Sequence, residues 1–195
     1  MAIRLKRSGL TYQDYLQLPD DGQRYEIIDG ELYVSPAPSM KHQRVSTRLT
    51  FVLTGHTLPG GLGQVFSAPF DVRLADPSTV QPDIVYVSRA HGDIITPQNA
   101  RGAPDLVVEI ISPSSTQMDL EIKRDLYARH GVKYYWVAHP LEEWLRAYEL
   151  GADGQYELVA EGQGDMTFSA PPFPDLTLRL SFLWDEWPST GPSDG

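Results

Sequence analysis

The alternation of hydrophobic and polar residues predicts a β-hairpin near the start of the chain. RYEII and ELYVS are alternating runs on either side of Asp29-Gly30, a dipeptide that type I′ turns prefer. A short helix in LTYQDYLQL ends at Pro19 before them. We therefore expect an N-terminal helix and hairpin over residues 10–35, followed by the chain-breaking segment SPAPS.

Helical spacing returns after this break. Ser39 is a helix-capping residue type, and the apolar residues that follow it recur at helical intervals up to about His56. The sequence then predicts strands at about 63–67, 70–74 and 81–88.

The segment DLVVEIIS at 105–112 is apolar on both faces, as expected of a central strand covered by helices on each side. Pro113-Ser114-Ser115 then turns the chain into a helix of about 116–130, closed by Gly131, and VKYYWVAHP is another buried strand. The predicted core at 39–138 thus runs helix, three strands, helix, strand.

Beyond Pro140 the pattern changes to an acidic hairpin extension over 141–187. It contains strands at about 144–150 and 155–161 around Asp153-Gly154, a strand at 176–180 and a last turn in SFLWDEW. Residues 188–195 form a tail that we expect to be frayed. The whole chain, 1–195, is predicted to be one domain of the α/β (α+β) class, with one mixed β-sheet flanked by helices and additional N-terminal and C-terminal β-hairpins.

Composition excludes several classes of protein. A chain of 195 residues that is 41% hydrophobic can bury a core without staples. The absence of cysteine excludes disulfide scaffolds, thiolate metal sites and cysteine nucleophiles. The apolar runs are far shorter than a membrane span requires, so we expect a cytoplasmic protein without membrane partners.

The formal charge of −10 is unevenly distributed. Residues 1–133 hold 14 basic and 15 acidic side chains, whereas residues 134–195 hold 2 basic and 11 acidic ones. This balance argues against strong, sequence-independent binding of nucleic acid. Basic clusters in the first part would still allow a polyanion to approach from one side.

Glu109 is the unusual residue, because it interrupts the apolar strand LVVEII. A carboxylate there must be paired with a cation or bound to a metal, and a structural salt bridge is as good an explanation as a metal ligand. Asp83 follows Pro82 at the start of IVYV; alone, it is most simply a turn residue. Together the two carboxylates would suit Mg²⁺ or Mn²⁺. Lys123, on the helix after the Glu109 strand, either extends along the core or stabilises charge on a phosphate.

Four segments resemble a known family. Pro82-Asp83 and Glu109 resemble the signature of the PD-(D/E)XK nuclease superfamily, whose core has the element order predicted above. YEIIDGELYVSPAPSMKHQRV, QPDIVYVS, APDLVVEIISPSS and IKRDLYARHGVKYYWVAHP resemble the Uma-type family of restriction endonucleases. The resemblance covers roughly residues 10–185.

The resemblance implies roles for individual residues. Asp83 and Glu109 would bind the metal, with the backbone carbonyl of Ile110 as a further ligand. The lysine of the superfamily triplet is replaced by Ile111, and the family suggests that Lys123 reaches into the same space.

Further candidates carry less weight. Glu26 and Glu31 match the family pattern and could each add a carboxylate, although exposed acids at a hairpin are the commoner explanation. His42 could contact phosphate or transfer a proton, or be a solvated helix residue. Gln81 could line the site. Basic residues that could follow a DNA backbone are Lys41, Arg44, Arg48 and Arg124.

Three functions remain open at this point. The first is a Mg²⁺-dependent endodeoxyribonuclease, acting as a homodimer because duplex DNA needs two cuts. The second is a catalytically inactive scaffold that binds nucleic acid or protein, which the net charge and Ile111 favour. The third is hydrolysis of another phosphate ester. An enzyme requires Asp83, Glu109 and Lys123 to converge, whereas a scaffold does not.

Overall fold

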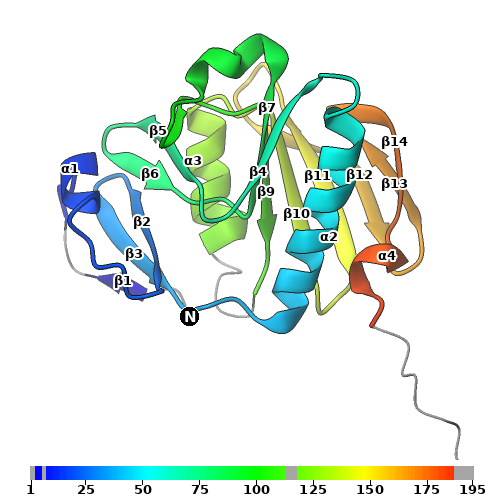
Figure 1. Ribbon diagram of the computed structural model, residues 1–195, viewed down its shortest axis with the longest axis horizontal. Coiled ribbons are helices and arrows are strands. Elements are labelled where there is room, and N and C mark those ends of the chain that lie inside the picture. The colour runs from blue at the N-terminus through cyan, green and yellow to red at the C-terminus, as the bar shows by residue number, and fades with distance from the viewer. Residues whose placement is uncertain (1–2, 6–7, 113–117, 187–195) are drawn as a thin grey trace, which may run out of the picture.

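The computed structural model describes residues 3–5, 8–112 and 118–186. Its central sheet is mixed and six-stranded (Figure 1). In spatial order the strands are β12 (Tyr156–Gln163), β11 (Trp144–Leu150), β10 (Tyr134–His139), β9 (Leu106–Ile110), β7 (Ile84–Ser88) and β4 (Gly63–Ser67). Among the described strands of this sheet, only β9 and β10 pair in parallel, with Val107 opposite Tyr135. The other neighbours in this sheet are antiparallel.

A second six-stranded sheet lies beside the first. Its order is β1 (Ile3–Leu5), β3 (Glu31–Ser35), β2 (Arg24–Ile28), β6 (Ser78–Val80), β5 (Asp71–Ala75) and β8 (Asn99–Arg101). The predicted hairpin of β2 and β3 is present, and Asp29 and Gly30 have the positive φ angles, 51° and 80°, that its turn requires. A two-stranded sheet of β13 (Thr167–Ala170) and β14 (Phe173–Arg179) completes the strands that the structure describes.

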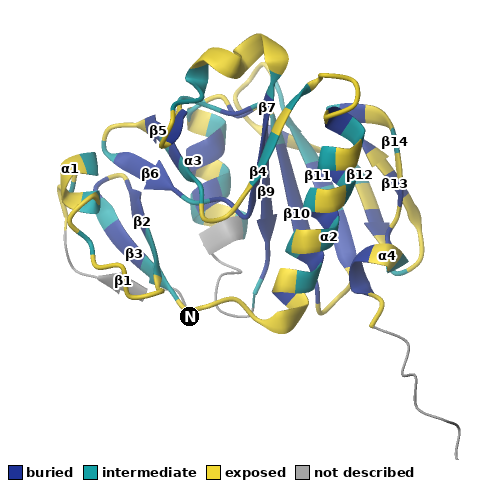
Figure 2. Cartoon of the chain, in the orientation of Figure 1, coloured by how far each residue is buried: buried dark blue, intermediate teal, exposed yellow. Residues whose placement is uncertain are grey.

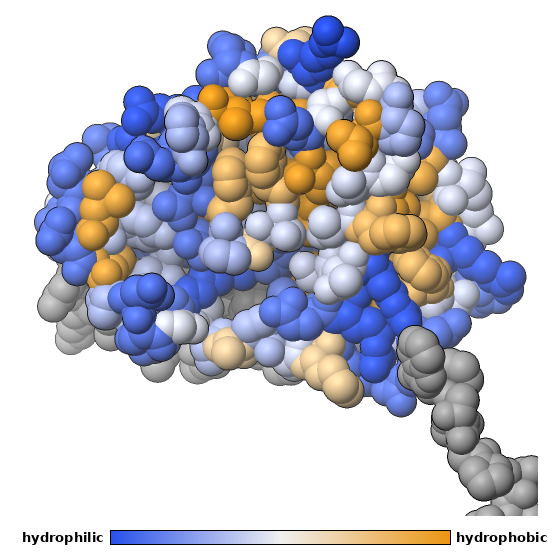
Figure 3. Space-filling view, in the orientation of Figure 1, coloured by the Kyte–Doolittle hydropathy of each residue, from blue (hydrophilic) through white to orange (hydrophobic). Residues whose placement is uncertain are grey.

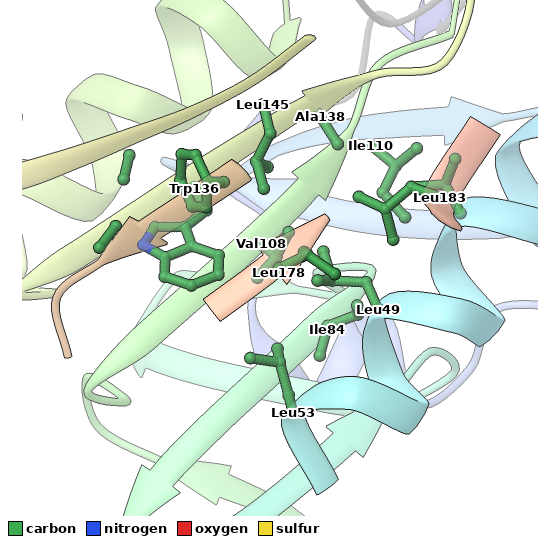
Figure 4. Packing of buried hydrophobic residues seen from close by; sticks show 14 of the residues in the cluster. Leu49, Leu53, Ile84, Val108, Ile110, Trp136, Ala138, Leu145, Leu178 and Leu183 are labelled. Carbon is green, nitrogen blue, oxygen red and sulfur yellow. The ribbon is translucent and has the colours of Figure 1, made fainter. Parts of the chain in front are cut away.

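Helices cover both faces of the central sheet. On one face, α2 (Met40–Thr57) inserts Val45, Leu49 and Leu53 into a core that also includes Trp136 and residues of α4 (Ser181–Trp184) (Figure 4). On the other face, α3 (Arg124–Arg129) packs between the two sheets. The remaining helical segments are α1 (Tyr12–Tyr15), the 3₁₀ segment η1 (Arg89–Ile94) and the π-helix η2 (Met118–Lys123).

The central strand β9 is buried at every position, as Figure 2 shows. Its side chains alternate between the two cores: Leu106, Val108 and Ile110 face α2, and Val107 faces α3. Glu109 shares the parity of Val107 and therefore points to the α3 side. The strand is apolar on both faces because helices cover both faces, as the sequence predicted.

The predicted fold class is confirmed, and several details differ. The prediction of a single sheet is wrong, because the N-terminal hairpin joins β5, β6 and β8 in a second sheet. The strand expected at 81–88 begins at Ile84, and the helix expected at 116–130 is the π-helix η2 followed by α3. The predicted turn at Pro113-Ser114-Ser115 and the tail 188–195 lie outside the described residues.

Candidate active site

Four charged side chains from four separate segments meet in the interior. They are Glu26 on β2, Asp83 immediately before β7, Glu109 on β9 and Lys123 at the end of η2, and each is at most 3% exposed. Burial of ionised groups costs several kcal/mol unless they are paired. The three residues that the nuclease hypothesis requires to converge therefore do so, and Glu26 joins them.

Strand pairing brings Asp83 to Glu109. Ile84 pairs with Val108 across the antiparallel β7 and β9, so one further step of the register places Asp83 opposite Glu109. The Oδ2 atom of Asp83 accepts a hydrogen bond of 2.7 Å from the backbone N–H of Ile110. Because the N–H and C=O of one strand residue point to the same edge, the carbonyl of Ile110 also faces the Asp83 side.

Lys123 lies between two carboxylates. Its Nζ is 2.8 Å from Oε1 of Glu26 and 3.1 Å from Oε1 of Glu109. Tyr127, one helical turn further on, donates its hydroxyl to the same Glu109 oxygen at 2.6 Å. Sequence reasoning did not assign Tyr127 to the site, although its spacing of four residues from Lys123 is the signal that could have.

Glu26 is held by the loop between β6 and β7 as well as by Lys123. Its Oε1 accepts the backbone N–H of Gln81 at 2.9 Å. The Gln81 side chain points elsewhere, donating to the Tyr15 hydroxyl and to Asp71, both at 2.9 Å. Gln81 thus contacts the cluster through its backbone, and the idea that Glu26 is an exposed hairpin acid is wrong because the residue is 1% exposed.

Arg24 is the second cation of the cluster, and sequence reasoning missed it. Its Nη1 donates to Oδ1 of Asp83 at 2.8 Å, and its Nη2 lies 3.8 Å from Oε2 of Glu109. The available signal was its position two residues before Glu26 on the same strand, which places both side chains on one face.

His42 contacts the cluster from the first turn of α2. Its Nε2 is 3.2 Å from Oδ2 of Asp83, and the side chain of Ser39 caps this helix by accepting the N–H of His42. Because a carboxylate only accepts, Nε2 carries the proton in this contact. The Nδ1 atom is buried and has no hydrogen-bond partner. The suggestion that His42 is a solvated helix residue is wrong, since it is 7% exposed.

The pKa shifts follow from burial and charge. Burial acts to raise the pKa of Asp83, but Arg24, the His42 hydrogen bond and Lys123 outweigh it and hold that pKa well below its usual range. Glu26 behaves alike: burial opposes ionisation, and Lys123 followed by Arg24 lowers its pKa overall. Burial also raises the pKa of Tyr127, and the charge of Glu109 adds to this effect.

The other predicted residues lie outside this cluster. Glu31 accepts a hydrogen bond from the Tyr33 hydroxyl, and Ile111 packs in the core beside α3. Arg44 and Arg48 donate to backbone carbonyls of Trp184 and Phe182, and Arg48 also donates to that of Asp185. Arg124 donates to the carbonyl of Tyr156, while Lys41 lines a pocket beside Arg44. Figure 3 shows hydrophilic side chains gathered beside α4, where Arg44 and Arg48 are engaged.

The donor set fits a hard divalent cation in type. Asp83 Oδ1 and Glu109 Oε2 both face the Arg24 guanidinium, so these two oxygens already share a cation. Among residues 3–5, 8–112 and 118–186, no three acidic or imidazole groups form a ready-made metal cage. Mg²⁺ does not need one, because it binds through one or two carboxylates and keeps several waters.

Comparison with known proteins identifies the family of this chain. The profile of Uma2, described as "Putative restriction endonuclease", matches residues 12–181. The chain belongs to the Uma2 family. Its match covers every charged residue of the cluster, and no helix in the described part of this Uma2 chain is long and apolar enough to cross a membrane.

Two relatives add to this. The uncharacterized protein slr1290 of Synechocystis sp. is 28% identical over 157 residues, which cover 77% of this chain and 79% of the relative. The crystal structure of a DUF820 protein from Anabaena variabilis, described as a putative nuclease, superposes with a TM-score of 0.73. It is 22% identical and covers 90% of this chain and 97% of its own, which shows that the two share a fold.

The lowered carboxylate pKa values predict acid sensitivity. A carboxyl group whose folded pKa lies below its unfolded value stabilises the fold above about pH 4–5, and this contribution is lost as pH falls towards the folded pKa. We expect the free energy of unfolding, measured with urea from pH 7 to pH 3, to decline less steeply in Asp83→Asn than in wild type. The exposed Asp93→Asn is the control, and an equal decline in both variants would contradict the prediction.

Proposed function

We propose that this Uma2 chain is a metal-dependent endonuclease that hydrolyses phosphodiester bonds in DNA, with Mg²⁺ or Mn²⁺ as its cofactor. Asp83 and Glu109 would hold the cation, and the backbone carbonyl of Ile110 would assist. One observation supports this above the others: Asp83, Glu109 and Lys123 come from three segments and converge in one buried cluster. The family description and the shared fold agree with it.

The cost of the cluster supports a functional role. A chain that needed only a core could fill this space with apolar side chains, and such replacements are often neutral or stabilising. Here three carboxylates and Lys123 are buried beside an otherwise apolar sheet, and Arg24 is partly buried next to them. Buried ionisable groups with strongly shifted pKa values concentrate at functional sites.

Each residue has a task in this proposal. A divalent cation, when bound, supplies Lewis-acid polarisation of the phosphate. Lys123 offsets negative charge that develops on phosphorus oxygens, and Glu26 and Tyr127 fix the position of its ammonium group and of Glu109. His42 orients Asp83 through Nε2, while its unpartnered Nδ1 can accept a proton or a hydrogen bond.

The partner in this proposal is DNA, which would bind away from the acidic C-terminal region. A homodimer would place two such sites on opposite strands, which a double-strand cut requires. Arg44 and Arg48 donate to backbone carbonyls of residues 182–185, and in this proposal their positive charges would still attract the DNA backbone.

A catalytically inactive scaffold is the second candidate, and one observation favours it. Arg24 already pairs with the two carboxylates that would hold the cation. A site that never binds metal would keep this arrangement permanently.

Incubation with supercoiled plasmid DNA tests the proposal. We expect wild type to nick or linearise the plasmid with Mg²⁺ or Mn²⁺ but not with EDTA, and Glu109→Gln to be inactive. Glu157→Gln, an exposed position on β12, should behave as wild type. RNA and a simple phosphodiester tested in parallel define the substrate. Absence of metal-dependent cleavage of any phosphodiester would favour the scaffold.

A further inference from the structure

Arg24 occupies the position between the two proposed metal ligands. One oxygen of each carboxylate has partners other than Arg24. Asp83 Oδ2 contacts Ile110 and His42, and Glu109 Oε1 contacts Lys123 and Tyr127. The other two oxygens, Asp83 Oδ1 and Glu109 Oε2, lie 2.8 Å and 3.8 Å from two nitrogens of the Arg24 guanidinium. A cation that joined these two oxygens would need the space that the guanidinium fills.

The hydrogen bonds of Arg24 are incomplete in this position. The guanidinium makes one hydrogen bond, to Asp83, while its Nε and Nη2 are buried without a hydrogen-bond partner. Each unsatisfied buried donor costs free energy, so charge attraction is what keeps the side chain there. The Arg24 side chain is also 23% exposed, whereas those of Asp83 and Glu109 are at most 4% exposed. It therefore has a route outward that the carboxylates lack.

Charge balance favours exchange over addition. Among the residues that the structure describes, Glu26, Asp83 and Glu109 carry three negative charges, and Arg24 and Lys123 carry two positive ones, which leaves one net negative charge without His42. Exchange of Arg24 for a divalent cation makes this buried group neutral. Addition of the same cation with Arg24 in place would leave a net positive charge and bring two cations together.

We propose that Arg24 is the resident counter-ion of the metal site: a divalent cation binds by displacing its guanidinium from Asp83 and Glu109, so Arg24 sets the metal affinity of the site. This inference rests on the proposed function, because it takes Asp83 and Glu109 as the metal ligands. It removes the argument for an inactive scaffold, since pairing with Arg24 is then the metal-free state of a working site.

Calorimetric titration with Mn²⁺ tests the displacement. We expect Arg24→Gln to bind Mn²⁺ about tenfold or more tightly than wild type, because the competing cation is gone. Arg129→Gln is the matched control: it removes the same charge from a surface pair with Asp29, whose groups are 54% exposed, and should bind as wild type does. Affinity in Arg24→Gln that equals or falls below that of wild type would overturn the proposal.

The outcomes separate this inference from the proposed function. Binding by wild type that Arg24→Gln leaves unchanged overturns only the role of Arg24. No binding by either protein at millimolar Mn²⁺ removes the metal site itself, and the inference with it.

A measurement on the wild-type protein covers the case in which Arg24→Gln does not fold. The Nε–H signal of Arg24 in a ¹⁵N–¹H spectrum can be assigned by its loss in Arg24→Lys. Saturating Mg²⁺ should shift this signal and speed its exchange with water, as the buried Nε becomes exposed. An Arg24 signal that Mg²⁺ leaves unchanged, while other site signals move, would overturn the proposal.

Discussion

Replacement of Lys123 by methionine is expected to lower the free energy of unfolding by about 3–5 kcal/mol, because loss of one partner leaves buried charges without compensation. Lys123 is 2% exposed and pairs with Glu26 and Glu109 at 2.8 Å and 3.1 Å. Without it, Arg24 would be the one remaining lysine or arginine that the described residues bring to the three buried carboxylates. Urea denaturation at pH 7 measures the change.

The double variant Lys123→Met/Glu26→Gln separates charge balance from packing. Removal of one carboxylate together with the ammonium restores the original net charge of the cluster, so most of the lost stability should return. Plasmid cleavage should stay absent in both variants, since neither has the ammonium. Lys133→Met, at a side chain that is 59% exposed, should change stability by less than about 1 kcal/mol. Equal stability of the single and double variants would contradict the charge argument.

The charged cluster is only partly predictable from the sequence. Glu109 was recognisable because a carboxylate within an apolar strand demands a partner, and Asp83 because it begins the neighbouring strand. Arg24 was not recognisable, since its contact with Asp83 depends on the second sheet bringing β2 towards β7 and β9. The nearest signal was local: Arg24 and Glu26 lie two residues apart on one strand, so both side chains are on the same face and need charged partners there.

The same limit applies to the fold. Hydrophobic periodicity predicted β9, β10 and α2, whose long apolar patterns leave few alternatives. It missed β6 and β8, which are three residues each and gain their order from pairing with β5. It also gave no sign of the π-helix η2, although this segment ends at Lys123 and helps to set where the ammonium group points.

The charge count of the cluster makes stability and function separable. Loss of a cation increases its net negative charge, whereas loss of one carboxylate brings it to neutrality. Substitutions at Arg24 and Lys123 should therefore cost the fold more than substitutions at the carboxylates, and the carboxylate substitutions should in addition weaken metal binding. A purely structural ion cluster would not produce this second effect.

Asp83→Asn should accordingly abolish function while the protein remains folded. Asparagine keeps the shape of the side chain and an oxygen that can accept from the Ile110 N–H, so we expect the free energy of unfolding at pH 7 to fall by less than the roughly 3–5 kcal/mol expected when a buried partner is lost outright. If Asp83 binds the metal as proposed, the loss of its charge should lower the rate of metal-dependent DNA cleavage on the order of 10³-fold or more.

Calorimetry with Mn²⁺, plasmid cleavage and urea denaturation on the same preparation of Asp83→Asn provide the measurements. The matched control is Asp105→Asn, because Asp105 also accepts a backbone N–H, that of Ser88 at 2.6 Å, but pairs with His91 instead of the cluster. Cleavage by Asp83→Asn at the wild-type rate would exclude Asp83 as a ligand. Unfolding of Asp83→Asn at pH 7 would mean that the carboxylate holds the fold as strongly as Lys123 does, because Arg24 would then depend on Asp83 for its burial, and the separation of stability from function would fail at that pair.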